Sequence, residues 1–325
     1  MTLQTAAAQQ ATPTYDAVLD RGVVKCGVHP GLIGFAKANS LGEYSGFDVD
    51  ICRAIAAAVF NDADAVEYVA VNAVERFEAL LNKEFDVLSR NSTWTSDRNI
   101  DFGNFVGVNY YDGQGFMVQK RSGIRSALEL DNVPICVSRG TTTELNAIDF
   151  FKVTDLRYKP IYKNSEVDTV SAYMSGECLA YTTDRSALAA QRTEFTNPDA
   201  HLVLPEVISK EPLGPIVRSD DARWENIARW SLNCMINAEE LGVTSANVDQ
   251  QSNATPAVRR LVGLEGESGA KMGVDNGWCG NIVRQVGNYG EIYEKHLGLN
   301  TPIGLPRGVN ALWTDGGLLY AAPIR

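Results

Sequence analysis

The segment from Phe85 to Arg98 changes abruptly from apolar to polar and could bind a small anion. Its first four residues, FDVL, are mostly apolar and predict a short buried strand. Hydroxyl and amide side chains follow, among them Asn91 and Thr93, and Arg98 adds a planar guanidinium that matches a carboxylate. Proteins of the α/β class place ligands at the carboxyl ends of strands. The same composition also suits a polar surface loop with an exposed arginine.

Two later positions offer groups that would complement a ligand of mixed charge. The residues from Gly140 to Glu144 follow a predicted strand and open a helix, whose free N–H groups can hold a carboxylate. Thr141 and Glu144 also have the spacing of a capping box, so a plain helix cap is an alternative. Asp184 ends another predicted strand and could accept hydrogen bonds from an ammonium group, or could simply cap the next helix.

Together these residues supply what a zwitterion needs. Arg98 and the helix start at Thr142 would pair with a carboxylate, and Asp184 would pair with an ammonium group. Asn91 and Thr93 add smaller polar groups beside Arg98. No Ser–His–Asp order and no Cys–His pair suggests a catalytic nucleophile. The combination therefore favours binding over catalysis.

The elements that must position these residues alternate between strands and helices. Strands at 23–28, 68–71 and 85–88 are separated by helices at 48–60 and 73–82, with Asp48 as the expected cap of the first helix. A second alternation runs from 127 to 204, and 211–217 predicts an extended return. The fold class is therefore α/β, with mostly parallel sheets.

The order of these elements predicts two lobes. Residues 15–116 and 218–325 form the first lobe, which includes a C-terminal extension, and residues 117–217 form the second. Two extended segments join the lobes and would act as a hinge. A cleft between two lobes is a preferred place for a small ligand.

Composition excludes several classes of partner. The chain of 325 residues has 29 basic and 40 acidic residues, a net charge of −11, which argues against nucleic acid and anionic membranes. Three scattered histidines are too few for a histidine-based metal site, and no nucleotide-binding glycine loop is found, so no cofactor is expected. No apolar run approaches the roughly 20 residues that span a bilayer. Residues 1–11 lack the features of an intact signal peptide.

Six cysteines without a C-x-x-C pair disfavour zinc and thioredoxin-like chemistry. The simplest of the possible pairings is sequential and would place the protein in an oxidising compartment. Six free thiols in a cytosolic enzyme are the alternative. The sequential pairs are Cys26–Cys52, Cys136–Cys178 and Cys234–Cys279.

These motifs together resemble the periplasmic solute-binding proteins of amino-acid ABC transporters (bacterial solute-binding protein family 3), and within them the general L-amino-acid binding subgroup. The resemblance covers nearly the whole chain. The motifs that carry it are Gly46–Asp50, Phe85–Arg98, Gly140–Thr142 and Asp184, with Gly107–Gly115, Glu211–Pro215, Gln285–Gly290 and Asn310–Trp313 for the subgroup.

The resemblance implies a monomeric, periplasmic protein with a type II two-lobed fold, which closes over a free L-amino acid or a small derivative and delivers it to a membrane permease. Arg98, Thr93 and the Thr142 amide would hold the α-carboxylate. Asp184 would hold the α-ammonium group, with the help of Asn91.

The resemblance also bears on the ligand side chain. Relatives that prefer basic amino acids carry an acid in place of His29 and a stacking tyrosine in place of Leu32, whereas relatives that take glutamate or aspartate carry an arginine that matches Arg76. Arg90 adds a second cation where many relatives have serine. We therefore expect acidic and amide side chains to be favoured, with broad tolerance that extends to γ-glutamyl compounds.

Two other classes share this fold. Dehydratases that act on cyclic amino-acid precursors need a general acid or base in the cleft, and no residue is singled out for that role. A ligand-sensing receptor domain would be followed by a membrane span or a signalling domain, which the sequence lacks. We therefore expect a binding protein that is not an enzyme.

Overall fold

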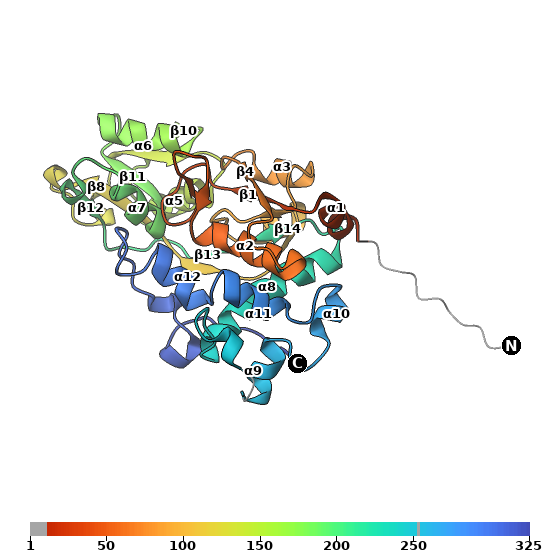
Figure 1. Ribbon diagram of the computed structural model, residues 1–325. Helices are drawn as coiled ribbons and strands as arrows, with labels where there is room; N and C mark the ends of the chain where they lie inside the picture. Colours follow the sequence, from red (N-terminus) through yellow and green to blue (C-terminus); the bar gives the residue numbers. More distant parts are fainter. Residues whose placement is uncertain (1–11, 252–253) are drawn as a thin grey trace.

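The structure, a computed structural model, describes residues 12–251 and 254–325 (Figure 1). Residues 1–11, in which no intact signal peptide is expected, lie outside the described residues. Within the described ranges, no helix is both long and apolar enough to cross a membrane. Two five-stranded sheets and a group of C-terminal helices make up the fold, in agreement with the predicted α/β class.

The first sheet has the strand order β4-β1-β5-β14-β6. Strands β4, β1 and β5 are parallel, and β14 returns antiparallel between β5 and β6. The strands are β1 (Val24–Val28), β4 (Val66–Ala70), β5 (Val87–Leu88), β6 (Asn104–Phe105) and β14 (Ile216–Val217). The small elements and helices of this part are α1 (Pro13–Arg21), β2 (Lys37–Ala38), β3 (Tyr44–Ser45), α2 (Phe47–Phe60), α3 (Arg76–Leu81) and α4 (Ser96–Asp101).

The second sheet repeats this plan with the order β10-β9-β11-β8-β12. Here β10, β9 and β11 are parallel, and β8 is antiparallel to both of its neighbours. The strands are β8 (Gln114–Gln119), β9 (Pro134–Ser138), β10 (Lys159–Lys163), β11 (Ala180–Asp184) and β12 (His201–Val203). The helices are α5 (Thr142–Val153), α6 (Glu166–Ser175) and α7 (Arg185–Arg192).

Two antiparallel strands connect the sheets, and their action as a hinge stays a prediction. They are β7 (Tyr110–Asp112) and β13 (Glu211–Leu213), which pair with each other. The first sheet takes its strands from residues 24–105 and 216–217, and the second from 114–203. The predicted boundary between 116 and 117 falls inside β8, and the division into lobes stays a prediction.

Among the described residues, three of the five C-terminal helices pack against the first sheet's helix α2 and the other two pack against the longest of them, so the extension belongs to that side of the molecule (Figure 1). Asn310 clamps the middle of β7, because its side chain accepts a hydrogen bond from the Tyr111 amide and donates one to the Tyr111 carbonyl. The helices are α8 (Ala222–Glu240), α9 (Pro256–Leu261), α10 (Ser268–Met272), α11 (Trp278–Gln285) and α12 (Tyr289–His296).

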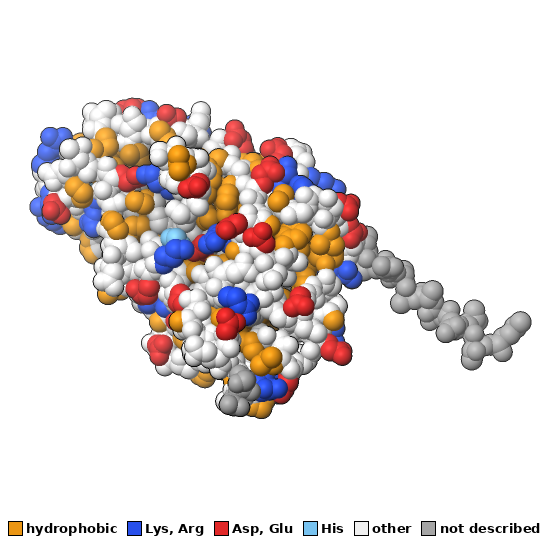
Figure 2. Space-filling model, in the orientation of Figure 1, with side chains coloured by type: hydrophobic (Ala, Val, Ile, Leu, Met, Phe, Trp, Pro, Cys, Tyr) orange, Lys and Arg blue, Asp and Glu red, His pale blue; other side chains and the backbone are white. Residues whose placement is uncertain are grey.

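The surface agrees with the acidic composition. Figure 2 shows acidic and basic side chains interspersed over one face of the molecule, without a continuous basic patch on that face.

All six cysteines form the sequential disulfides that the sequence favoured over free thiols. Cys26–Cys52 joins strand β1 to helix α2, and Cys136–Cys178 joins β9 to the residues before β11. Cys234–Cys279 joins α8 to α11. Each disulfide therefore lies within one part of the fold, and none of them joins the two sheets.

We expect the variant Cys136→Ser/Cys178→Ser to lose up to about 4 kcal/mol of unfolding free energy, because the bond closes a loop of 42 residues. Urea unfolding followed by circular dichroism measures this change. As a control, mass mapping should detect six alkylatable thiols in the wild-type protein after reduction and none before it. An unchanged urea midpoint in the variant would contradict the prediction.

Candidate ligand-binding site

Two adjoining cavities lie between the sheets. The inner cavity, of about 40 Å³, is lined by Ala73, Arg76, Arg90, Asn91, Thr93, Ser138, Thr141, Thr142, Thr143, Glu166, Thr183 and Asp184. The outer cavity, of about 440 Å³, is lined by residues that include His29, Ala73, Arg90, Glu166, Val167, Val170, Met174, Gln191 and Phe195. Six of the eight predicted site residues therefore line the inner cavity, and His29 lines the outer one. Arg98 lines neither cavity but forms a hydrogen bond with Thr93, which lines the inner one.

The polar segment after β5 is not a loose surface loop. Thr95 accepts a hydrogen bond from the Arg98 amide and caps helix α4, an element that the sequence analysis did not predict. Arg98 is only 9% exposed, and its Nη1 donates to the Thr93 carbonyl oxygen at 3.0 Å. The chain thus folds Arg98 back against Thr93, with its other guanidinium nitrogens free of protein partners among the described residues.

Arg76, the first residue of α3, is buried next to Arg98. The ring of Phe77 lies 4.8 Å from the Arg76 guanidinium and 5.0 Å from that of Arg98, so one aromatic side chain supports both cations. Among the described residues, no hydrogen bond or ion pair reaches the Arg76 side chain. A buried guanidinium without a partner is costly unless an anion compensates its charge.

Arg90 adds a third cation and borders both cavities. Its Nε donates to the Val71 carbonyl oxygen at 2.8 Å, and burial lowers its pKa to about 10. Burial also lowers the pKa of Arg76, and the nearby Arg98 and Arg90 cations lower it further. The wall that the first sheet contributes is therefore strongly positive.

Asp184, at the end of β11, faces this wall from the second sheet. It occupies the cap position of α7 but makes no capping bond, since Asp112 Oδ2 accepts from the Ser186 amide instead. Burial raises the pKa of Asp184, and the neighbouring Asp112 and Glu211 carboxylates raise it further. No hydrogen bond or ion pair reaches its carboxylate from the described part of the chain. The capping alternative is thus wrong, and the carboxylate is available to a cation.

Helix α5 begins at Thr142 in the inner cavity. Thr141 caps it by accepting from the Glu144 amide, but the Glu144 carboxylate accepts from the Gly140 amide. Only half of the predicted capping box therefore forms. The first amides of a helix have no partner inside the helix and can bind an anion.

Glu211, on the connecting strand β13, was missed by the sequence analysis. Its Oε2 accepts from Thr93 Oγ1 at 2.6 Å and from Thr142 Oγ1 at 2.9 Å, and it is 1% exposed. This carboxylate therefore holds the two threonines of opposite sheets together. Its position as an acidic residue in an otherwise apolar extended segment could have marked it as a site residue.

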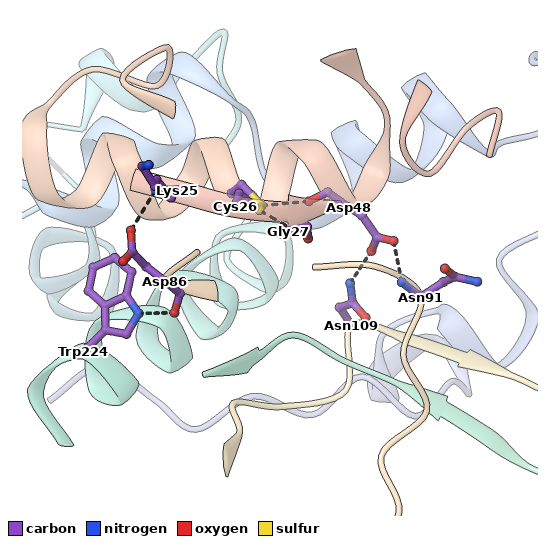
Figure 3. The surroundings of a disulfide bond; sticks show 9 residues. Lys25, Cys26, Gly27, Asp48, Asp86, Asn91, Asn109 and Trp224 are labelled. Atoms are coloured by element: carbon purple, nitrogen blue, oxygen red, sulfur yellow. Dashed lines mark hydrogen bonds between the residues drawn. A yellow bond between two sulfur atoms is a disulfide. The ribbon is translucent and has the colours of Figure 1, made fainter. Parts of the chain in front are cut away.

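Asp48 was also misjudged, as Figure 3 shows. Gly46, not Asp48, holds the cap position of α2. The buried Asp48 carboxylate instead accepts from the Asn91 amide at 2.8 Å and from Asn109 Nδ2 at 3.1 Å. Asn91 has a φ of 30°, a strained conformation that asparagine tolerates better than most residues. Asp48 therefore fixes the backbone of Asn91, whose Oδ1 remains without a hydrogen-bond partner among the described residues.

His29 does not line the inner cavity. Its Nδ1 accepts from the Gly31 amide, and its Nε2 pairs with the carboxylate of Glu166 on the second sheet's helix α6. Gln191 donates to the other oxygen of Glu166. Burial opposes ionisation of Glu166, but His29 and the Arg90 and Arg76 cations outweigh it and lower its pKa. Neither Glu166 nor Gln191 was predicted, because both become polar neighbours only in the folded chain.

Comparison with known proteins gives a consistent result. The family described as bacterial extracellular solute-binding proteins, family 3, matches residues 24–250. The general L-amino acid-binding periplasmic protein of Rhizobium johnstonii is 49% identical over 324 residues, which are 98% of this chain and 95% of the relative. The glutamate/glutamine/aspartate/asparagine-binding protein of Rhodobacter capsulatus is 49% identical over 315 residues, 96% and 93% of the two chains.

A solved structure has the same fold over its full length. A periplasmic binding protein of Brucella ovis, described with glutathione bound, superposes with a TM-score of 0.95 at 48% identity. The superposition covers 97% of this chain and 100% of that one.

We expect Asp48→Asn to loosen the residues around Asn91, because an amide nitrogen would replace one of two acceptor oxygens and leave a buried donor unpaired. The loss in unfolding free energy is about 1–3 kcal/mol. Hydrogen–deuterium exchange of the Asn91 amide should accelerate, whereas the matched change at the exposed Asp20 should leave it unaltered. Equal protection in Asp48→Asn and wild type would contradict this role.

Proposed function

Because the chain belongs to the bacterial extracellular solute-binding proteins of family 3, we propose that it binds free L-amino acids with acidic or amide side chains and delivers them to the permease of an ABC transporter. Its relatives are amino-acid-binding proteins of ABC transporters, and the chain is not an enzyme. The periplasm is the proposed location.

One observation carries the proposal. Buried charges of opposite sign, at Arg76 and Asp184, face one cavity without pairing with each other.

The head group of an amino acid fits these charges. In the proposed complex Arg98, Thr93 and the first amide of α5 hold the α-carboxylate. Asp184 accepts hydrogen bonds from the α-ammonium group, and the unpartnered Asn91 Oδ1 accepts another. Bound ammonium would also compensate the carboxylate cluster that raises the pKa of Asp184.

The side-chain preference follows from Arg76 and Arg90. After Arg98 takes the α-carboxylate, these two cations remain on the wall of the inner cavity. A side-chain carboxylate or amide oxygen would give Arg76 the acceptor that it lacks. The Rhodobacter relative, by its name, binds glutamate, glutamine, aspartate and asparagine. Broad tolerance is proposed because the Rhizobium relative is named for general L-amino acids.

We extend the proposal to γ-glutamyl compounds. Such a compound keeps the free α-amino-acid head that the site would hold, and its side-chain amide oxygen can still face Arg76. The Brucella structure is described with glutathione, a γ-glutamyl peptide. Flexing of the connecting strands β7 and β13 would open the space between the sheets to such a ligand.

We expect Arg98→Ala to lower affinity for glutamate by roughly 30-fold to more than 1,000-fold while the protein stays folded. The reason is that truncating one partner of a buried charge pair costs about 2–5 kcal/mol. Isothermal titration calorimetry measures the affinity, and Arg121→Ala, at an exposed arginine, is the matched control. Retention of wild-type affinity would exclude the proposed carboxylate contact.

Arg76→Met separates the side-chain contact from the head-group contact. Affinity for glutamate should fall by about 10-fold to 150-fold, as expected for losing a hydrogen bond to a charged group, whereas affinity for alanine should change little. The ligand-free variant should unfold at the same or a higher temperature, because a buried unpaired cation is removed. Arg121→Met is the control, and equal losses for glutamate and alanine would refute the assignment.

A further inference from the structure

We propose that the outer cavity is a second part of the ligand site, which takes an apolar substituent on the side-chain amide of a γ-glutamyl compound. The inference rests on the proposed function and adds the class of extended ligand. Three observations support it: the two cavities share lining residues, helix α6 presents apolar side chains to the outer cavity, and the acidic side chains of the outer cavity are paired.

The two cavities share a boundary. Ala73, Arg90 and Glu166 line both of them, with Ala73 and Arg90 on the first sheet's side and Glu166 on the second. Ala73 has the smallest side chain of the three and therefore obstructs the boundary least. A ligand side chain directed past Ala73 would therefore pass from the charged inner cavity into the outer one, whose volume is about 440 Å³.

The outer cavity is apolar where the inner one is charged. Val167, Val170 and Met174 are spaced by three and four residues, so they lie along one face of α6. Phe195 lines the same cavity. Val167 is 75% exposed and Met174 is 41% exposed, so this face holds apolar surface that a ligand could cover. Covering such surface is favourable in proportion to the area removed from water.

The acidic side chains of the outer cavity already have partners. Glu166 pairs with His29 and accepts a hydrogen bond from Gln191. Glu194 pairs with Lys37. A positively charged group that sought these acids would have to displace one of the contacts, whereas an alkyl or thioether group would lie on α6 without disturbing them. A terminal charge farther along the ligand would remain at the open mouth in water.

A series of γ-L-glutamyl alkylamides tests the inference. Isothermal titration calorimetry is performed on the full chain with L-glutamine and with the methyl-, ethyl-, propyl- and butylamides. If the alkyl group enters the outer cavity, each added methylene raises the affinity by up to about fourfold, the value for burying one methylene. A flat or falling series, with normal glutamine binding, overturns the inference and leaves the proposed function intact.

Val167→Glu provides the second test, with Val153→Glu as its matched control. Both valines are exposed on helices of the second sheet, at 75% and 85%, and Val153 lines neither cavity. We expect Val167→Glu to bring the ratio of butylamide to methylamide affinity close to one, and Val153→Glu to leave the wild-type ratio unchanged. An unchanged ratio in Val167→Glu overturns the inference.

Failure of the proposed function would look different. In that case glutamate, glutamine and the methylamide would all fail to bind the wild-type protein, and the inference would fall with it. Circular dichroism and thermal unfolding of each variant verify that a changed ratio does not come from a loss of fold.

Discussion

The site depends on buried charges that the protein itself leaves uncompensated. Arg76, Arg90 and Arg98 come from the first sheet's side, and Asp184 comes from the second. None of the three arginines forms an ion pair with an acid of the described residues. Charges held in this way cost free energy in the empty protein, and a ligand with complementary charges recovers it. A zwitterionic ligand would therefore compensate both the buried arginines and the buried carboxylate of this site.

The rest of the fold supplies the stability that offsets this unfavourable free energy. Each sheet has its own apolar core, and disulfides cross-link each side internally. Phe77 holds two guanidinium groups against one ring, and Asp48 holds the strained backbone of Asn91. These contacts fix the charged groups before any ligand arrives, which reduces the ordering cost of binding.

The contacts between the two sides are of two kinds, because Ala187 and Ala190 of α7 pack against the apolar core of the first side, whereas the contacts near the cavities are polar. Glu211 joins Thr93 to Thr142, and Glu166 joins His29 to the second sheet. The C-terminal extension adds Asn310, which clamps β7, one of the two connecting strands. When the sheets separate, the groups of such polar bridges can exchange their protein partners for water. The arrangement suits a protein that must admit and release its ligand.

Local patterns in the sequence were enough to predict the alternating elements. The strand and helix periodicities identified the α/β class. The polar segment before Arg98, the residues around Thr142 and the position of Asp184 pointed to one site, and the disulfide pairing followed the simplest order. Family resemblance then supplied the class of ligand. Short elements such as α4 were missed, because six residues carry little periodicity.

Only the tertiary structure decided which polar groups are free. Asp48 was expected to cap α2, but Gly46 holds that position. Asp184 could have capped α7, but Asp112 accepts the hydrogen bond from the Ser186 amide instead. Asp48 meets Asn91 across 43 residues, and Glu211 meets Thr93 across 118. A hydrogen bond of this range leaves no local signature, since it depends on where two sheets bring their ends. The sequence alone therefore determined the elements and the residue types that gather at the candidate site, whereas the fold determined which charges remain unpaired.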